Sequence, residues 1–279
     1  MAYANLEGPT APTVRRNGAL STKEIGFSFD NDVYTNYPQF NYHPQLVADL
    51  IESGFDVVST ANNHSLDRFA LGVDQTIDEL RKVNLPFTGT RKVADNKVSI
   101  LDFDWHTTTQ VKGRTIAWLA CTFSTNGIPD KQSQVLDCFK HTKIMLEQIN
   151  KLSQRADIDA VIVTPHWGDE YKYKPNSGQV RLAKELLEAG ALAVLGTHPH
   201  VLQPWEKHIT KDGRETFIVY STGNFISGQV VVARDTSAMV QLNLAAPVGE
   251  KLKIRGVLYL PLFVTRHTGF VVNPILDVK

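Results

Sequence analysis

The sequence predicts an α/β fold with a mostly parallel sheet. Strand-like segments alternate with helical patterns of roughly 10 to 20 residues, which is typical of βαβ units. Polar clusters directly follow several of these strands, as at the ligand-binding edge of an open α/β sheet. No internal repeat or linker divides the 279 residues, so we expect one domain over residues 1–279.

The first third of the chain predicts two helices separated by a strand. Residues 43–53 carry apolar residues at helical spacing and end before Gly54. Residues 55–60 predict a short buried strand, and residues 86–89 a short strand or turn. A second helix is expected from residue 68 onward, because apolar positions step by four, four and three residues at Phe69, Val73, Ile77 and Leu80.

The middle of the chain predicts a hairpin and then a long helix. Residues 98–103 and 114–123 have strand character, and the polar segment 107–113 is expected to join them. Residues 134–156 carry the longest helical pattern, with Cys138 and Met145 on its apolar side.

The last part of the chain predicts further strands around one helix. The helix is expected at residues 180–189, where Gly190 ends it. Strands of the sheet are expected at residues 158–164, 191–195 and 217–220. Residues 237–244 and 251–260 predict two antiparallel strands joined by a turn.

Composition and charge narrow the classes of function. Hydrophobic residues make up 42% and charged residues 21%, which is typical of a globular chain. The 29 Lys and Arg residues balance 29 Asp and Glu residues, which argues against a nucleic-acid-binding or polybasic membrane protein. No apolar run is long enough to span a bilayer, and residues 1–7 do not resemble a signal peptide. Cys121 and Cys138 lack the spacing of a zinc ribbon or a redox pair, so we expect two buried free thiols.

Three polar clusters at predicted strand ends contain four of the nine histidines. The candidate residues in them are Asn62, Asn63, His64 and Asp67, then His166 and Glu170, then His198 and His200. Because ligands bind at the carboxyl ends of strands in α/β sheets, we expect these clusters to form one site. Surface or structural roles are expected for the other five histidines, which are His43, His106, His141, His208 and His267.

The residue types in these clusters point to metal-dependent chemistry. Neutral imidazoles with nearby carboxylates or amides suit divalent ions such as Zn, Fe or Mn. A pair of such ions can activate water for phosphoester hydrolysis, and a histidine that does not bind metal can protonate the leaving oxygen. The alternative is a set of scattered histidines with no common site.

Five motifs, in this order, resemble the CapA family of poly-γ-glutamate capsule synthesis proteins, a branch of the calcineurin-like metallophosphatase superfamily. They are Asn5-Leu6-Glu7-Gly8-Pro9, residues 62–67, residues 166–171, residues 198–203 and Gly223-Asn224-Phe225-Ile226, and they cover residues 5 to about 230. The resemblance implies a calcineurin-like metallophosphoesterase fold, in which two mixed β-sheets form a sandwich flanked by helices. Residues 231–279 are expected to add strands to the same domain.

The resemblance also implies roles for the candidate residues. His64 is expected to protonate the leaving group, with Asp67 orienting it. The expected metal ligands are Asn63, His166 and His198 for one ion, His200 for the other, and Glu7 between them, with Asn5 as the alternative to Glu7. The residues expected to contact substrate or shape its pocket are Asn5, Asn62, Glu170 and Asn224. A solvent-exposed carboxylate is an equal alternative for Glu170.

One part of the family pattern is missing from the sequence. Family members normally begin with a strand that ends in Gly-Asp and supplies a ligand of the first metal, and no such motif precedes Asn5 here. We therefore expect the first strand to be absent, with one divalent ion (Mn, Zn, Fe or Mg) bound firmly and a second bound weakly or not at all. The sheet edge left uncovered would favour a homo-oligomer.

Two classes of function remain open from the sequence. One is a metal-dependent hydrolase that acts on a phosphoester or on a bond of a cell-envelope polymer. The other is a non-catalytic component of the capsule synthesis machinery that binds the anionic polymer through a degenerate metal site. Candidates for a positive rim are Arg15, Arg16, Lys172 and Lys174. The resemblance implies a location at the cell envelope if a leader precedes this sequence.

Overall fold

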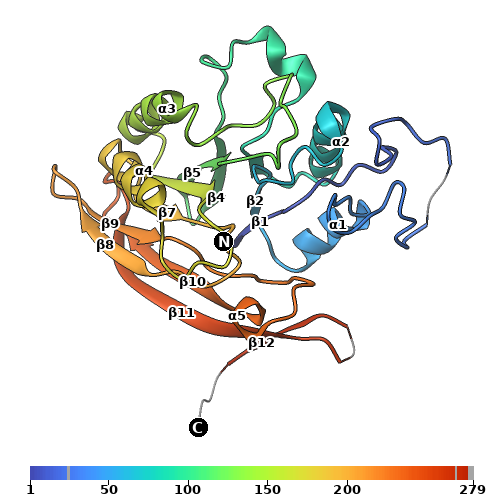
Figure 1. Cartoon of the computed structure of the whole chain (residues 1–279). Coiled ribbons are helices and arrows are strands. Elements are labelled where there is room, and N and C mark those ends of the chain that lie inside the picture. The colour runs from blue at the N-terminus through green and yellow to red at the C-terminus, as the bar shows by residue number, and fades with distance from the viewer. Residues whose placement is uncertain (24–25, 268, 276–279) are drawn as a thin grey trace. The chain divides into compact units, whose positions relative to one another are not determined.

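The computed structural model describes residues 1–23, 26–267 and 269–275. Figure 1 shows the helices and strands of the chain, which divides into two compact units. Unit 1 comprises residues 1–113 and 117–144, and unit 2 comprises residues 114–116 and 145–279. The chain was expected to form one domain, and that expectation stays a prediction.

Unit 1 contains a parallel sheet of three short strands. The strands are β1 (Tyr3–Asn5), β2 (Val57–Ser59) and β3 (Phe87–Thr88), with β2 in the centre. The helices α1 (Gln45–Glu52) and α2 (Phe69–Lys82) confirm both helix predictions in this region. Their apolar faces are buried because Val47 of α1 and Leu80 of α2 pack with Val58 of β2 in one core cluster.

The two strands of the hairpin lie closer to each other along the chain than the sequence predicted. Its strands are β4 (Thr107–Val111) and β5 (Arg114–Thr122), so the segment expected to be a connection is itself a strand. Lys112 and Gly113 both have positive φ, 50° and 72°, which suits a two-residue turn between antiparallel strands. The predicted strand at residues 98–103 is wrong, because this segment forms turns that follow the short 3-10 helix η1 (Val93–Lys97). There the guanidinium of Arg91 donates a hydrogen bond to the carbonyl of Val98 (3.0 Å).

The predicted helix at residues 134–156 is confirmed only in its second half. Helix α3 spans Thr142–Gln154. The preceding residues are extended, because Val135 forms a bridge with Thr90 and Asp137 forms one with Thr122. A run of apolar residues fits a helix or a buried extended segment equally well, and here pairing with neighbouring segments decides between them.

The prediction of two free thiols is also wrong, since Cys121 and Cys138 form a disulfide. The extended segment runs beside the end of β5, and the N–H of Cys138 donates to the carbonyl of Thr122 (2.8 Å). The two Cα atoms therefore lie 5.0 Å apart, within the usual range for a disulfide. The two cysteines are 17 residues apart in the sequence, and this spacing does not indicate that they lie close together in the fold.

The strands of unit 2 that carry the predicted site are mostly parallel. In spatial order they are β6 (Ala160–His166), β7 (Ala193–Leu195), β9 (Glu215–Val219) and β8 (Trp205–Ile209), with only β8 antiparallel to its neighbour. Helix α4 (Ser177–Glu188) contacts β7. Asn176 caps α4 by accepting from the N–H of Gln179 (3.0 Å). The predicted strands and helix are confirmed here, and β8 was not predicted.

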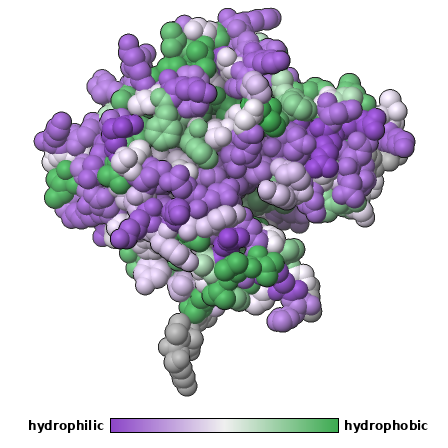
Figure 2. All heavy atoms as spheres, viewed as in Figure 1, coloured by the Kyte–Doolittle hydropathy of each residue, from purple (hydrophilic) through white to green (hydrophobic). Residues whose placement is uncertain are grey.

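An antiparallel sheet follows in unit 2. It consists of β10 (Thr236–Ala245), β11 (Lys253–Thr265) and β12 (Val271–Pro274), after the four-residue helix α5 (Val232–Asp235). The first two strands confirm the prediction, and β12 was not predicted. The ring of Trp205 on β8 packs edge-on against Tyr259 on β11, 5.2 Å between centroids. Figure 2 shows a hydrophobic surface in the region of β12, where Phe270 and Val271 are exposed.

The predicted α/β class is confirmed: three sheets and five α-helices are formed by the residues that the structure describes. Among the same residues, none of the helices combines the length and apolar character needed to cross a bilayer.

Candidate functional site

The loop after β2 in unit 1 is a compact turn held by its own side chains. The hydroxyl of Ser65 donates to the carbonyl of Thr60 (2.7 Å) and accepts from the N–H of Asn62 (2.8 Å). The amide of Asn62 donates to the carbonyl of Leu6 (2.7 Å) and accepts from the N–H of His64 (3.1 Å). Asn62 is fully buried, so the structure places it as the link between this loop and the segment after β1.

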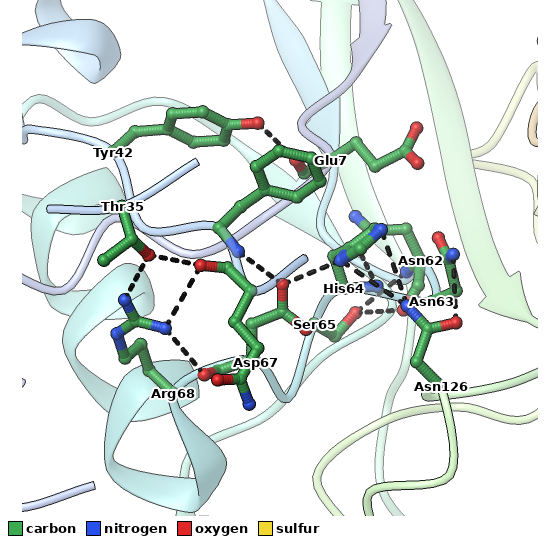
Figure 3. Close-up of polar contacts among 12 residues, drawn as sticks. Glu7, Thr35, Tyr42, Asn62, Asn63, His64, Ser65, Asp67, Arg68 and Asn126 are labelled. Carbon is green, nitrogen blue, oxygen red and sulfur yellow. Dashed lines mark hydrogen bonds and ion pairs between the residues drawn. The ribbon is translucent and has the colours of Figure 1, made fainter. Parts of the chain in front are cut away.

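His64 and Asp67 form a buried pair in this loop. The Nδ1 atom of His64 lies 2.7 Å from Oδ2 of Asp67, which also accepts from the N–H of Phe40 (2.7 Å), as Figure 3 shows. A carboxylate accepts only, so Nδ1 carries a proton and Nε2 is the nitrogen that can gain or release one. The ring of Phe40 packs edge-on against the imidazole, 4.5 Å between centroids, and fixes its plane.

Asn126 joins this cluster and was not among the predicted residues. Its Oδ1 accepts from the side-chain amide of Asn63 (3.2 Å), and its Nδ2 lies 3.5 Å from each ring nitrogen of His64 (Figure 3). Asn126 precedes Gly127 in a loop after β5, and an Asn-Gly pair in a sequence indicates a turn and nothing more. Its role depends on contacts formed only in the tertiary fold, so no sequence pattern could indicate it.

Arg68 supports the other side of the pair and is also buried. Its guanidinium donates to the carbonyl of Asp67 (2.9 Å), to the carbonyl of Val33 (3.1 Å) and to the hydroxyl of Thr35 (2.5 Å). Burial lowers its pKa to about 10, so the side chain stays cationic at neutral pH. Arg68 thereby links the segment that carries Thr35 to the loop of Asp67 (Figure 3).

Asn5 and Glu7 lie beside Asn62 at the end of β1. The side chain of Asn5 donates to the carboxylate of Glu7 (3.3 Å) and accepts from Asn62 (3.4 Å). The phenol of Tyr42 donates to the carbonyl of Glu7 (3.0 Å). Burial, reinforced by the charges of Glu7 and Asp67, raises the pKa of Tyr42, so the phenol remains a donor.

In unit 2, three histidines gather at the ends of two neighbouring strands. His166 ends β6 and pairs with Thr197 beyond β7, where its Nδ1 lies 2.9 Å from the hydroxyl of Thr197. The ring centroid of His198 lies 4.8 Å from that of His166 and 5.7 Å from that of His200. Parallel pairing of the strands thus brings together residues separated by more than 30 positions.

The backbone of the His198 loop adopts unusual conformations. His198 and His200 have positive φ, 99° and 58°, which non-glycine residues seldom adopt. Gly196 precedes them, and a Cβ atom there would lie 2.2 Å from the carbonyl oxygen of Tyr220 and 2.4 Å from Nε1 of Trp167. Strain of this kind is characteristic of functional sites, where the surrounding structure holds it in place.

Glu170 completes a cluster with metal-ligand spacing. One ligand atom each from Glu170, His198 and His200 lies within 4.8 Å of the others. The two loops are joined by a hydrogen bond from the N–H of Tyr171 to the carbonyl of Pro199 (2.8 Å). Two imidazoles and one carboxylate are the protein ligands of many catalytic zinc and iron sites, so this donor set fits a divalent ion.

Asn224 orients His200 within the cluster. Its Oδ1 lies 2.8 Å from Nδ1 of His200, and its Nδ2 donates to the carbonyl of Arg234 (3.0 Å) and to the side chain of Gln229 (3.3 Å). Because the two acceptors fix the amide, Oδ1 receives the Nδ1 proton and Nε2 of His200 carries the lone pair. Metal-binding histidines are commonly held in this way by a second residue.

The structure therefore brings the predicted residues together in two groups, one in each unit. The group in unit 1 comprises Asn5, Glu7, Asn62, Asn63, His64 and Asp67. The group in unit 2 comprises His166, Glu170, His198, His200 and Asn224. Among the other histidines, His208 lies 3.2 Å from the carboxylate of Glu188 and His43 packs on Phe27 and Tyr34.

Known proteins are similar to this chain over most of its length. The family model of the bacterial capsule synthesis protein PGA_cap matches residues 2–229. The capsule biosynthesis protein CapA of Bacillus anthracis is 33% identical over 206 residues, which are 72% of this chain and 47% of that protein. The PGA biosynthesis protein CapA of Bacillus subtilis (strain 168) is 34% identical over 241 residues, which are 86% of this chain and 56% of that protein. The chain thus spans about half the length of these relatives.

A solved structure gives a more distant comparison. The sulfate thiohydrolase SoxB of Thermus thermophilus, in complex with glycerol, is 16% identical with a TM-score of 0.45, covering 77% of this chain and 34% of that one. The family match includes all five motifs and both groups of candidate residues. The chain belongs to the PGA_cap family of bacterial capsule synthesis proteins.

Proposed function

We propose that this protein is a metal-dependent hydrolase that acts on a phosphoester or on a bond of the capsule polymer. The observation that carries the proposal is the cluster of Glu170, His198 and His200, whose ligand atoms lie within 4.8 Å of one another. The names of the two relatives place them in capsule and PGA biosynthesis, which supports an anionic polymer as the substrate.

A divalent ion fits the cluster by the chemistry of its donors. Imidazole and carboxylate ligands suit Zn, Fe and Mn better than Mg, which prefers oxygen ligands. Glu170, His198 and His200 would hold the ion, with His166 beside them and Asn224 fixing the ring of His200. When bound, such an ion lowers the pKa of water and stabilises negative charge on a phosphoryl or carbonyl oxygen.

His64 and Asp67 supply the proton transfer in this proposal. Protonated His64 donates from Nε2 to the leaving oxygen, while Asp67 holds Nδ1–H and stabilises the imidazolium before transfer. The side-chain amide of Asn63, the neighbour of His64 in the chain, is oriented by its hydrogen bond to Asn126.

The experiment compares metal content and turnover in the purified protein. Metal is measured by mass spectrometry, and turnover is followed with phosphomonoesters, phosphodiesters and poly-γ-glutamate before chelation, after chelation and after restoring Mn, Zn or Fe. We expect chelation, Glu170→Gln and His200→Ala each to reduce both metal content and turnover. His208→Ala is the matched control, because its ring pairs with Glu188 instead.

Turnover that survives both chelation and His200→Ala would contradict the proposal. Binding of poly-γ-glutamate without any cleavage of the substrates would instead support the non-catalytic function in polymer assembly.

A further inference from the structure

We propose that Arg234 binds an anionic group of the substrate beside the metal-ligand cluster, an inference that rests on the proposed function. The Cζ atom of Arg234 lies 3.6 Å from the centroid of the Tyr171 ring, so the guanidinium is stacked on the aromatic face. Stacking uses the face of the guanidinium and leaves the N–H groups in its plane for hydrogen bonding.

The guanidinium of Arg234 has no anionic partner within the described parts of the chain. Several other arginines of unit 2 are paired, as Arg214 is with Asp212 (2.7 Å) and Arg155 is with Asp157 (2.7 Å). Arg234 is half-buried, and its hydrogen bonds with the described residues involve its backbone, as acceptor from Asn224 and as donor to Val231. An arginine whose position is fixed but whose charge is unmatched is suited to an external anion.

Arg234 belongs to the same network that positions His200. Asn224 donates to the carbonyl of Arg234 (3.0 Å), and its Oδ1 lies 2.8 Å from Nδ1 of His200. Tyr171, on which the guanidinium stacks, has its ring centroid 6.0 Å from that of His200. A substrate group held by Arg234 would therefore lie close to the metal-ligand cluster.

The segment that carries Arg234 is fixed before any ligand binds. Arg266 forms an ion pair with Asp235 and donates to the carbonyls of Ser227 (3.1 Å) and Gln229 (2.6 Å). The side chain of Gln229 in turn donates to the phenol of Tyr171 (3.3 Å). Preorganisation of this kind reduces the entropy lost on binding.

The chemistry of the ligand follows from the guanidinium. Its planar fork matches a carboxylate or a phosphate, each of which can accept two parallel hydrogen bonds. Both anions are present in the candidate substrates, as the side-chain carboxylates of poly-γ-glutamate or the phosphate of a phosphoester. The shared requirement is an oxyanion next to the scissile bond.

The experiment measures binding directly, by calorimetry, on the full chain with its metal content recorded. The probes are a γ-linked glutamate hexamer, the corresponding neutral glutamine hexamer, and inorganic phosphate. We expect Arg234→Gln to raise the Kd of an anionic probe about tenfold or more, as for loss of a charge-assisted hydrogen bond. Arg234→Lys keeps the charge without the fork and should give a smaller increase. Arg181→Gln is the control, because Arg181 is exposed on α4 near Glu185 (3.8 Å).

The pattern of binding across the three probes tests whether Arg234 binds an anion and which anion it is. Weaker binding of the glutamate hexamer alone assigns carboxylates to Arg234, and weaker binding of phosphate alone assigns a phosphoester. Unchanged binding of both anions in Arg234→Gln, or an equal loss for the neutral hexamer, would overturn the inference. If Arg234→Gln loses its circular dichroism signal, Arg234→Lys decides the same question. Because binding is measured without turnover, absence of hydrolysis would refute the proposed function and leave this result standing.

Discussion

At the scale of single residues, the pair of His64 and Asp67 separates proton transfer from metal binding. We expect His64→Ala to lower kcat by roughly 10²- to 10⁴-fold, the usual contribution of general acid catalysis. Metal content should stay near that of the unaltered protein, because the Glu170, His198 and His200 cluster lies in the other unit. Asp67→Asn should also lower kcat, because an amide can donate to Nδ1 and favour the wrong tautomer.

Kinetics with metal analysis on the same samples provide the measurement for this pair. Loss of metal in His64→Ala that accounts for the loss of kcat would show that His64 acts through the ion. His43→Ala is a suitable control, because the ring of His43 packs against Phe27 and Tyr34 and not against His64 or Asp67 in the described contacts.

Asn126 provides a second test at the residue scale. Its amide accepts from Asn63 and lies 3.5 Å from the ring of His64. Asn126 therefore orients the side chain of Asn63 and forms part of the polar surroundings of the His64 ring. We expect Asn126→Ala to lower kcat severalfold with little change in metal content. Asn126→Asp keeps the acceptor for Asn63 but adds a negative charge beside His64, which stabilises the positive charge of the protonated imidazole.

The pH profile of kcat distinguishes these roles of Asn126. A protonated His64 is the active form of the acid, so the added negative charge in Asn126→Asp should extend activity to higher pH. A purely structural role would lower kcat equally at every pH in both variants.

At the scale of elements, the disulfide joins the end of β5 to the extended segment that precedes α3. The cross-link closes a loop of 17 residues that contains Asn126. Loops of this length give roughly 3 kcal/mol of stabilisation in the chain-entropy account. We expect reduction to lower the free energy of unfolding by about 2–4 kcal/mol, measured by urea denaturation with and without dithiothreitol.

The double variant Cys121→Ser/Cys138→Ser is the control for this prediction. It should match the reduced protein in stability and show no response to dithiothreitol. Equal midpoints for the oxidised and reduced protein would contradict a stabilising role.

The elements show where sequence patterns were sufficient. Helices α1, α2 and α4 were predictable because each buries one apolar face, and β2, β6, β7 and β9 because each is a buried apolar run. Strand β8 was missed because Glu206, Lys207 and His208 interrupt its apolar pattern. The segment before α3 was misassigned because its pairing partners, Thr90 and Thr122, are distant in the sequence.

In the candidate site, too, local sequence patterns predicted some residues, whereas others depend on contacts between distant segments. Histidines at strand ends were predictable, since parallel strands bring their carboxyl ends to one edge. Asn126, in a loop, and Arg234, in the short helix α5, were not, because their roles depend on tertiary contacts with Asn63 and Tyr171. Sequence patterns therefore located the ligand-bearing strands but not the residues that orient their side chains.

At the scale of the whole molecule, strand β5 is divided between the units, and its residues 114–116 belong to unit 2. There the carboxylate of Asp159 accepts hydrogen bonds from the guanidinium of Arg114 (2.7 Å) and from the N–H of Thr115 (2.7 Å). Arg114 also donates to the carbonyls of Ala246 (2.9 Å) and Pro247 (2.8 Å), in the turn between β10 and β11. Asp159 thus holds Arg114 in a position from which Arg114 also contacts the turn between β10 and β11.

This arrangement predicts how stability depends on pH. Burial alone raises the pKa of Asp159, but the hydrogen bonds from Thr115 and Arg114 outweigh it and hold the pKa below the usual value. A carboxyl group with a lowered pKa stabilises the folded state fully above about pH 5, and this contribution is lost as the pH falls through the folded pKa. We expect Asp159→Asn to lower the free energy of unfolding at pH 7 by roughly 1.5–3 kcal/mol and to flatten its decline below pH 5.

Asp212 gives the matched comparison, because its pKa is also lowered, to about 2, by hydrogen bonds from Thr210 and Arg214. Its side chain is 60% exposed, whereas that of Asp159 is 19% exposed, so solvent and salt screen its ion pair much more strongly. Asp212→Asn should therefore change stability by less than 1 kcal/mol, and that change should shrink in 1 M salt. Urea denaturation from pH 7 to pH 3 measures both variants. An equal effect of the two substitutions would show that burial of Asp159 adds nothing to its ion pair, and that the contact of β5 with unit 2 depends on packing instead of charge.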